Sequence, residues 1–327
     1  MALILNREEV ASLLTMKDAI EAVEESFRDL AQGNADMPLR PTIRVSQPPG
    51  VVNVMPAYLG RMGALGVKLV SSYPENPGKF NLPTVQATIL YSDHRTGELL
   101  AVMDGGYITA VRTGAASGVA TQYLARRDCR IAGVLGSGIQ AQTQLEAMCA
   151  VRTIKVAKVF SPTPAHRASF AERMAAKLGI EVIPVSDAAQ AVKGCDIVVA
   201  ASAAKTPILM GDWLSPGTHI NGIGSHTPDA RELDEKTIRK SKIVVDSMEA
   251  ALREAGDLLM PMADGVIGKN HIYGELGELV LGKKTGREHN DEITLFKSQG
   301  LAIEDVSTAK AVYEKAKAQG KGTDLRL

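Results

Sequence analysis

The residues best suited to do chemistry begin with a glycine-rich turn near the middle of the chain. An apolar run, 131–135, ends in Gly136-Ser-Gly-Ile-Gln-Ala141, and a helix-like segment follows over 140–150. In such a turn the first glycine permits the tight bend, the second lets the backbone approach a pyrophosphate, and the alanine permits close packing of helix on strand. The start of the helix offers free N–H groups to phosphates. Further strand-like segments follow at 156–160, 181–185, 196–200, 219–223 and 242–246. We therefore predict a Rossmann-type domain that binds a dinucleotide.

The end of the second strand of this domain bears on which dinucleotide binds. NAD-binding domains usually carry Asp or Glu about 20 residues after the glycines, where it binds the ribose hydroxyls. Here the strand ends in Ser161-Pro-Thr163, and His166 and Arg167 follow. With no acid to repel a 2′-phosphate, and with hydroxyls and Arg167 to bind one, the sequence favours NADP(H). The alternative is that Arg167 is a solvated residue of the next helix.

Three cationic side chains occur in segments that otherwise look packed. Arg44 and Lys68 lie in predicted strands, and Arg112 lies in a helix rich in small residues. Burying a lone charge costs several kcal/mol, so each needs an anionic partner. A substrate carboxylate, gripped by planar guanidinium groups, is one candidate. The alternative is an ordinary salt bridge to Asp or Glu, or exposure on an edge strand. For Arg112 the substrate and the alternative weigh evenly, whereas for Arg44 and Lys68 the alternative is favoured.

Composition excludes several classes of protein. The 327 residues suffice for two domains with their own cores, and 37 basic against 37 acidic residues leave no net charge to attract nucleic acid or a membrane surface. No stretch approaches the apolar length of a transmembrane helix, and the N-terminus does not read as a signal peptide. Three scattered cysteines do not suggest a disulfide framework, so we expect a cytoplasmic protein. The histidines show no metal-binding spacing, so we expect no metal.

The first third reads as an α+β unit. Asn6 with Glu9 and Thr15 with Asp18 look like helix N-caps, and an apolar helical face ends near Gly33. Strands are predicted at 42–46, 51–55, 67–71, 84–91 and 99–103, the last two joined as a hairpin. A helix of small residues, 107–125, then leads into the glycine-rich strand, and an amphipathic helix, 301–318, is expected to fold back onto the first unit. The fold class is therefore α/β, with the Rossmann domain inserted in a split α+β domain.

Six segments occur in an order that characterises one known family. They are Val54-Met55-Pro56, Gly66-Val-Lys68-Leu-Val, Asp104-Gly-Gly-Tyr-Ile-Thr-Ala-Val-Arg112-Thr-Gly-Ala, Gly136-Ser-Gly-Ile-Gln-Ala, Ile220-Asn-Gly-Ile-Gly-Ser-His-Thr-Pro-Asp229-Ala-Arg-Glu-Leu-Asp234 and Asp291-Glu-Ile-Thr-Leu-Phe-Lys-Ser298. Together they resemble the ornithine cyclodeaminase/mu-crystallin family over nearly the whole chain. The segments around Arg112 and Pro228-Asp229 are the most specific.

The resemblance implies a split substrate-binding and dimerisation domain, 1–115 with a returning helix at 304–327, and a Rossmann domain at 116–303. It further implies a homodimer, a small amino or imino acid substrate, and NAD(P)(H) as cofactor. Arg44 and Arg112 would hold the substrate carboxylate, Lys68 would hydrogen-bond the substrate or move a proton, and Met55 and Thr84, with Gln86 and the region of Val280, would line the pocket. The residues expected to contact the cofactor are Thr113, Gly136, Ser137, Gly138, Ile139, Gln140, Ser161, Thr163, Arg167, Ala201, Ser202, Gly224, Lys297 and Ser298.

One departure separates the members. Ornithine cyclodeaminases carry an aspartate where this chain has His226, whereas Asp229 belongs to the Pro-Asp version of the ketimine reductase and crystallin-like members. His226 can exchange a proton near neutral pH, so His226 and Asp229 join Lys68 as catalytic candidates; packing against the ribose or capping the loop is the alternative for His226. The sequence thus favours an NAD(P)-dependent reductase or dehydrogenase acting at the Cα–N bond. Ornithine cyclodeamination and non-catalytic ligand binding are the alternatives.

Overall fold

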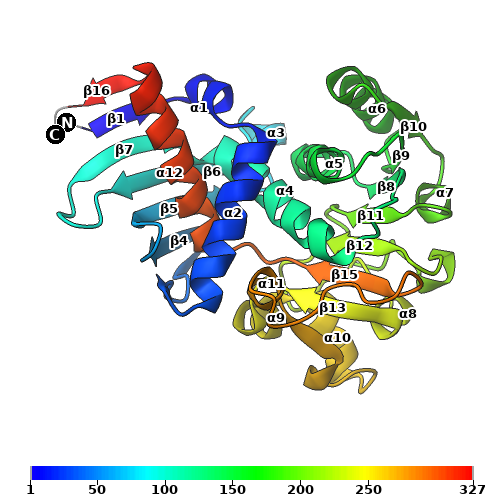
Figure 1. The fold of residues 1–327 in the computed structure, drawn as a ribbon. Coiled ribbons are helices and arrows are strands. Elements are labelled where there is room, and N and C mark those ends of the chain that lie inside the picture. Colours follow the sequence, from blue (N-terminus) through cyan, green and yellow to red (C-terminus); the bar gives the residue numbers. More distant parts are fainter. Residues whose placement is uncertain (1, 326–327) are drawn as a thin grey trace. The chain divides into compact units, whose positions relative to one another are not determined.

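The computed structural model describes residues 2–325 and divides the chain into two compact units. Unit 1 comprises Met1–Arg112 and Leu301–Leu327, and unit 2 comprises Thr113–Gly300. Unit 2 is thus inserted in unit 1 (Figure 1). The boundaries lie after residues 112 and 300 instead of the expected 115 and 303, because helix α4 (Gly105–Leu124) runs from one unit into the other and the last helix begins soon after the second boundary.

Unit 1 is built on an eight-stranded sheet of order β16-β1-β7-β6-β5-β4-β2, with β3 also paired to β4. All its pairs are antiparallel except β1 with β7. The strands are β1 (Ala2–Leu5), β2 (Ala35–Asp36), β3 (Thr42–Ser46), β4 (Pro49–Leu59), β5 (Ala64–Ser72), β6 (Val85–Ser92), β7 (Leu99–Asp104) and β16 (Thr323–Leu325). The antiparallel α+β unit expected from the sequence is confirmed, but β1 and β16, which bring the two ends of the chain together, were not expected.

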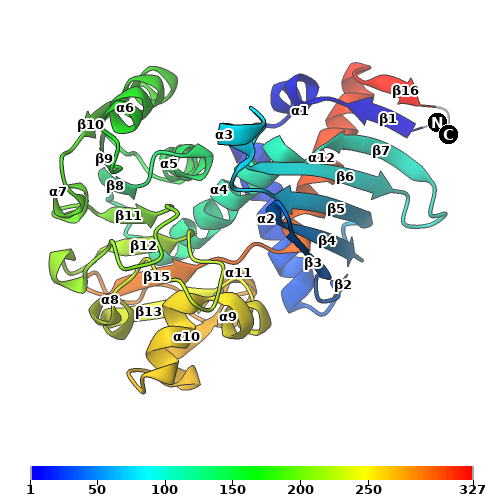
Figure 2. The same ribbon diagram turned by 180° about the vertical axis from the view of Figure 1, so that it is seen from behind.

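Helices cover one face of this sheet. They are α1 (Arg7–Leu13), α2 (Met16–Ala31) and α12 (Ala302–Gln319). The short α3 (Asn76–Lys79) follows β5 in the chain and does not belong to this layer. Figure 1 shows α2 and α12 lying across the strands, and α12 contacts β4, β5 and β6. The register aligns Met55, Lys68 and Ile89 on this covered face, and all three are buried. Figure 2 shows the strands from the other side, where no helix of unit 1 lies over them.

Local signals in the sequence set the helix starts of unit 1. Asn6 accepts hydrogen bonds from the backbone of Glu8 and Glu9, and the Glu9 carboxylate accepts one from Asn6 N. Thr15 and Asp18 form the same reciprocal pair at the start of α2. Both expected N-caps are therefore confirmed, and α2 is followed by Gly33 at φ +75°, a conformation that favours glycine.

Unit 2 is a fully parallel eight-stranded sheet of order β10-β9-β8-β11-β12-β15-β13-β14. The strands are β8 (Ile131–Leu135), β9 (Val156–Phe160), β10 (Glu181–Pro184), β11 (Ile197–Ala200), β12 (His219–Gly222), β13 (Ser241–Val245), β14 (Ile272–Glu275) and β15 (Ile293–Lys297). The order β10-β9-β8-β11-β12 is the doubly wound one, in which the order of the strands reverses between β8 and β11. Strands β11 and β12 are buried along their whole length, as parallel strands covered on both faces require.

The connecting helices of unit 2 complete the Rossmann pattern. They are α5 (Ile139–Val151), α6 (Pro164–Leu178), α7 (Ala188–Val192), α8 (Glu235–Lys240), α9 (Met248–Glu254), α10 (Gly256–Ala263) and α11 (Leu276–Val280), with single turns at Gly211–Trp213 and Lys269–His271. Gly133, inside β8, lets the sheet approach α7, since a Cβ there would lie 2.1 Å from the Ala191 carbonyl oxygen.

Two searches of residues 2–325 define what this part of the chain lacks. None of its helices combines the length and the apolar character needed to span a bilayer. It also contains no group of three or more His, Cys, Asp or Glu side chains arranged to hold a metal ion. The three cysteines are free thiols.

Candidate active site

The glycine turn lies at the carboxyl edge of the parallel sheet, where the strand order reverses. Gly136 has φ +121°, and a Cβ on it would lie 2.3 Å from the Ala201 carbonyl oxygen. Its N–H donates to the Phe160 carbonyl at 2.8 Å. Only glycine satisfies this φ and this close approach, so the turn is packed directly against the loop that follows β11.

Gly138 differs from Gly136, because no neighbouring atom of the described chain excludes a side chain at this position. It is the N-cap residue of α5, without a side-chain hydrogen bond to the helix start, and a Cβ on it would meet no atom of the described chain within 4 Å. The chain's own packing therefore does not require glycine here. Helix α5 has 13 residues, and no side chain caps its N-terminus. The open space beside this N-terminus fits the pyrophosphate of a dinucleotide, which needs both the close approach and the free N–H groups.

Hydroxyl groups and an arginine meet at the end of β9. The hydroxyls of Ser137 and Ser161 are 3.0 Å apart, which joins the glycine turn to the β9 end. Arg167 donates to the Ser161 carbonyl at 2.9 Å, and its guanidinium lies 5.9 Å from the centre of the Phe160 ring. Arg167 is therefore held against the end of β9 by these two contacts. Thr163, the N-cap residue of α6, is exposed.

In unit 1 a buried cluster of charges forms between β5, α4 and α12. Lys68 is 1% exposed, and its Nζ lies 2.6 Å from Asp305 Oδ2. Burial lowers the pKa of Lys68 from 10.5 to about 8; the Asp305 carboxylate opposes this, and the nearby Arg112 charge adds to it. An ammonium of this pKa can give up a proton near neutral pH, as a catalytic lysine must.

Arg112 belongs to the same cluster. Its Nε donates to Asp305 Oδ1 at 2.9 Å and its Nη1 to Glu304 Oε2 at 2.8 Å. Burial disfavours the charge of Arg112, but the two carboxylates more than offset this and raise its pKa. Arg112 and Lys68 thus both have the acidic partners that burial of their charges requires. Nη2 of Arg112 donates to no described residue, so one edge of the guanidinium is left for a further acceptor.

Arg44 shares a sheet face with these residues. Arg44 pairs with Val51, four residues before Met55, and Met55 pairs with Lys68. Because paired residues and residues two or four apart on a strand point to the same side, Arg44, Met55 and Lys68 lie on one face. Arg44 is exposed on β3, as expected, and makes no hydrogen bond or ion pair with any residue between 2 and 325.

The structure places two further residues that were expected in the pocket, Thr84 and Gln86. Gln86 pairs with Ser71, and both are on the face opposite Lys68, so Gln86 does not line a pocket with Lys68 in this unit. Thr84 directly precedes β6, and its carbonyl accepts a hydrogen bond from Tyr73 N at 2.8 Å. The register of β5 with β6 decides these positions, and the sequence of β6 by itself does not contain it.

The remaining expected residues of unit 2 separate into exposed and buried groups. His226 and Asp229 lie on the exposed loop after β12, where a hydrogen bond from Thr227 lowers the pKa of Asp229. Lys297 and Ser298, in contrast, are 0% and 1% exposed. Lys297 donates to the Gly222 carbonyl, and Ser298 to Asp246, so neither offers a surface to a ligand in this arrangement. Their hydrogen bonds instead join β15 and the residue after it to the ends of β12 and β13.

The sequence reasoning missed four acidic residues that hold candidate groups within each of the two units. Glu304 and Asp305 open α12 and hold the cations of unit 1. Asp246 accepts the backbone N–H groups of Ser247, Gln299 and Gly300. Glu232, inside a segment quoted above, is fully buried, and burial raises its pKa to about 7 against the opposing hydrogen bonds from Ser202 and the charge of Lys297. The signal that could have identified these residues is the presence of an acidic side chain in an otherwise apolar segment.

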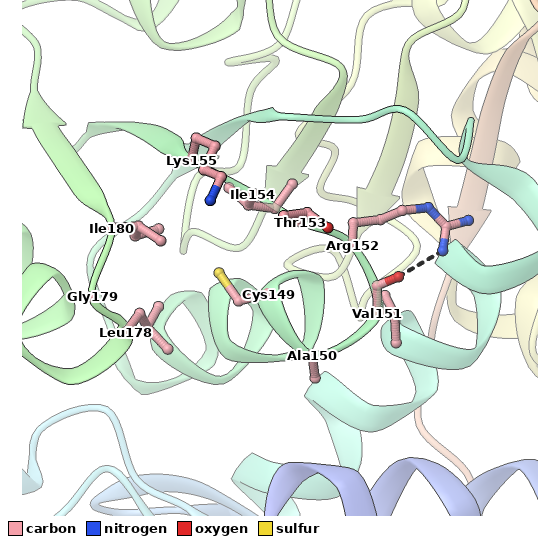
Figure 3. A pocket seen from close by; sticks show the side chains of 10 residues that line it. All are labelled: Cys149, Ala150, Val151, Arg152, Thr153, Ile154, Lys155, Leu178, Gly179 and Ile180. Carbon is pink, nitrogen blue, oxygen red and sulfur yellow. Dashed lines mark hydrogen bonds between the residues drawn. The ribbon is translucent and has the colours of Figure 1, made fainter.

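An open hollow on unit 2 is unrelated to the glycine turn. Figure 3 shows that Cys149, Arg152 and Ile180 are among its lining residues, which come from the end of α5, the loop to β9 and the loop after α6. The glycine turn is at the other end of α5. Arg152 donates to the backbone carbonyls of Thr121 and Ala125 at the end of α4, which gives it a structural role.

These features define a class of protein: a Rossmann nucleotide-binding unit inserted in an α+β unit that carries buried cations. The family can also be stated. The chain belongs to the ornithine cyclodeaminase/mu-crystallin family, whose model matches residues 1–320. The resemblance found in the sequence is therefore confirmed.

Individual relatives are similar over their full length. The chain is 52% identical to a Thermococcus litoralis Δ1-pyrroline-2-carboxylate reductase solved with NADH and L-proline, with a TM-score of 0.96 over 99% of this chain and 100% of that one. It is 41% identical to an archaeal alanine dehydrogenase dimer solved with NAD, with a TM-score of 0.93 over 99% of each chain. It is also 41% identical to the alanine dehydrogenase of Archaeoglobus fulgidus, over 99% of this chain and 98% of that protein.

The different roles of the two glycines can be tested. In Gly138→Asp the added carboxylate fills the open space beside α5, so we expect the affinity for nicotinamide dinucleotide to fall at least tenfold by charge repulsion and steric exclusion. Thermal stability without ligand should be unchanged or slightly higher, because Asp is a good N-cap residue. Fluorescence titration with NADH and thermal melting measure the two effects.

Gly268→Asp is the matched control, because Gly268 is also an N-cap residue with no atom within 4 Å of a Cβ. We expect it to bind NADH normally. Unchanged NADH affinity in Gly138→Asp would show that no dinucleotide binds at this turn.

Proposed function

We propose that the chain is an NAD(P)-dependent oxidoreductase that acts on the C–N bond of a small amino acid or cyclic imino acid. The observation that carries the proposal is the shared sheet face of Arg44 and Lys68, with Arg112 in the same ion cluster as Lys68. Two guanidinium groups and an ammonium of lowered pKa suit a substrate with a carboxylate next to a C=N bond. Pyrroline-2-carboxylate, piperideine-2-carboxylate and the imine of pyruvate all have this form.

Each residue has a distinct part in the proposed reaction. Arg44 and the free edge of Arg112 bind the carboxylate, which orients the imine carbon and neutralises the substrate charge. Lys68 Nζ donates a proton to the substrate nitrogen, or hydrogen-bonds it, and so favours the iminium form that accepts hydride readily. The nicotinamide cofactor, when bound, supplies or accepts the hydride. Met55 packs beside Lys68, and His226 is a second candidate for proton exchange.

The glycine turn and the β9 end hold the cofactor in this proposal. The N–H groups at the start of α5, with Gly138 and Ile139, bind the pyrophosphate, and Ser161, Thr163 and Arg167 surround the adenosine ribose. We favour NADP(H), because β9 ends without an acid and Arg167 is held at that position. NAD(H) is the alternative, since NADH or NAD is the cofactor of the solved relatives cited above.

Ornithine cyclodeamination is the second candidate function. It is supported by the family and opposed by His226, which stands where cyclodeaminases of this family carry an aspartate. Without that carboxylate the chain lacks the expected group for the distal ammonium of ornithine. A binding protein without turnover is less well supported, because a carrier has no need of the buried Lys68.

The experiment that tests the function is an absorbance assay at 340 nm, with NADPH and NADH in parallel. The purified protein is offered pyrroline-2-carboxylate, piperideine-2-carboxylate, or pyruvate with ammonia. Rapid oxidation of either cofactor with one substrate supports the proposal and gives the cofactor preference. If all are inert, release of proline and ammonia from ornithine with NAD⁺ would support cyclodeamination instead.

The role of Arg44 yields a clean mutational prediction, because this side chain is exposed and supports no other described residue. In Arg44→Ala we expect the KM for the imino acid to rise about tenfold to a hundredfold, the range of a lost charged hydrogen bond. The Kd for NADH and the melting temperature should stay at their wild-type values. Arg95→Ala, which removes another exposed arginine of unit 1, is the control. An unchanged KM in Arg44→Ala would remove Arg44 from the site.

The lowered pKa of Lys68 predicts a pH dependence. The ammonium is present below about pH 8 and is lost as the pH rises through that value, so kcat/KM for imine reduction should fall on the alkaline side with an apparent pKa near 8. In Lys68→Arg the side chain stays charged, so the rate should be lower throughout but should not fall near pH 8. A wild-type alkaline limb that persists in Lys68→Arg would belong to another group, such as the substrate nitrogen.

The uncovered face of the unit 1 sheet supports a further part of the proposal, a homodimer. The register places Ile4, Ile43, Leu69 and Leu90 on this one face, and they are 39%, 58%, 51% and 43% exposed. Exposed apolar residues spread over β1, β3, β5 and β6 are typical of an interaction surface. A second copy of the chain is the proposed occupant, and the archaeal alanine dehydrogenase was solved as a dimer.

Leu69→Asp should weaken this dimer, because the new carboxylate would be desolvated in the interface. Sedimentation velocity should then show a monomer, or a dimer dissociating at least tenfold more readily. Ile183→Asp, on an exposed position of β10 in unit 2, should sediment like the wild type. A wild-type protein that sediments as a monomer at micromolar concentration would contradict the proposal.

A further inference from the structure

A buried carboxylate joins two loops at the carboxyl edge of the parallel sheet. Glu232 is 0% exposed. Its Oε1 accepts hydrogen bonds from Ser202 N at 2.7 Å and Ser202 Oγ at 2.5 Å, and its Oε2 accepts one from Gly224 N at 2.7 Å. Ser202 follows β11 and Gly224 follows β12, so one side chain ties the exits of these neighbouring strands together.

The fit around this carboxylate is close. A Cβ on Gly224 would lie 2.1 Å from Glu232 Oε2 and 2.4 Å from the Ser202 carbonyl oxygen, so the position requires glycine. The same loop after β11 also touches the glycine turn, because a Cβ on Gly136 would meet the Ala201 carbonyl oxygen at 2.3 Å. A chain of direct contacts therefore runs from the dinucleotide turn through residues 201–202 to Glu232 and the loop after β12.

A second buried acid holds Glu232 in place. Asp257 Oδ1 accepts the backbone N–H groups of Glu232 and Leu233 at 2.7 and 3.0 Å. Lys297 Nζ lies 3.3 Å from Asp257 Oδ2 and donates to the Gly222 carbonyl at the end of β12. The ammonium thus balances part of the negative charge. The ion pair with Asp257 explains why Lys297 is buried, although the family resemblance implies that Lys297 contacts the cofactor.

We propose that Glu232 is a positioning residue for the nicotinamide half of the cofactor, holding the loops after β11 and β12 at the spacing that this half requires. The inference rests on the proposed function. In a doubly wound sheet the dinucleotide crosses the switch point, with one mononucleotide on each side of it. The adenosine half belongs to the β8 and β9 side, where Ser161 and Arg167 lie, so the β11 and β12 exits receive the other half.

The test compares Glu232→Gln with a matched carboxylate at the opposite edge of the same sheet. Asp196 Oδ2 accepts the backbone N–H groups of Arg130 and Ile131 at 2.7 and 2.9 Å, and so joins β11 to β8 at their amino ends. In Glu232→Gln the amide NH2 must face one of the N–H donors that the carboxylate now accepts. In Asp196→Asn the same replacement is made far from the cofactor edge of the sheet.

For Glu232→Gln we expect the Kd for NADH, measured by fluorescence titration, to rise about tenfold and kcat to fall at least tenfold. The KM for the imino acid at saturating cofactor should change less than about threefold, because the carboxylate site is in unit 1. Asp196→Asn should lower the melting temperature by about as much as Glu232→Gln does. It should keep the wild-type Kd for NADH and the wild-type kcat. Ser202→Ala, a milder change that removes one of the three bonds to Glu232, should raise the Kd by a smaller factor in the same direction.

The outcomes separate the possibilities. A wild-type Kd and kcat in Glu232→Gln would overturn the positioning role. Equal losses of NADH affinity in Glu232→Gln and Asp196→Asn would also overturn it, since the effect would then follow general stability. If Glu232→Gln does not fold, an unchanged Kd in Ser202→Ala decides against the role. A wild-type protein that binds neither NADH nor NADPH would overturn the proposed function itself.

Discussion

The Asp305 carboxylate forms ion pairs with two cations that reach it from separate parts of unit 1, Lys68 on β5 and Arg112 on α4. With Glu304, the cluster contains two acids and two bases, all nearly excluded from solvent. Burying such charges costs several kcal/mol per ion, and removing any one of them leaves an unpaired charge that costs about 3–5 kcal/mol. Helix α12 must therefore return to the sheet, although 193 residues separate Arg112 from Asp305 in the chain.

A buried ionic cluster is a poor means of stabilising a fold, because apolar residues of similar volume would often do as well. It is a good means of tuning a lysine. The apolar surroundings and the Arg112 charge both push the pKa of Lys68 downwards, while Asp305 keeps the ammonium in place. Groups whose pKa is shifted by burial and by a specific charge partner cluster at functional sites. The stability cost and the proposed chemistry of unit 1 thus have the same origin.

In unit 2, glycines and buried carboxylates fix the loops at the carboxyl edge of the sheet. At this edge the loops approach closely at Gly136 and Gly224, where even a methyl group would collide with a neighbouring carbonyl or carboxylate. Buried acids then fix the loops: Glu232 joins the exits of β11 and β12, and Asp246 accepts the backbone N–H groups that follow β15. Because each carboxylate accepts several N–H groups, the loops are held without side chains that would occupy the ligand's space.

The sequence by itself determined the features that depend on neighbours in the chain. The glycine turn, the N-caps at Asn6 and Thr15 and the strands β3 and β9 follow from local φ requirements, side-chain reach and periodicity, and they were predicted at the observed positions. The tertiary structure decided the rest. Strand β1 and the edge strand β16 are too short to show a pattern, and they pair across almost the whole length of the chain. The partners of Arg112, the face on which Gln86 lies, the burial of Lys297 and the bridging position of Glu232 all depend on contacts between distant segments. Register and burial set these contacts, and with them the pKa of each buried group, so no local pattern could predict them.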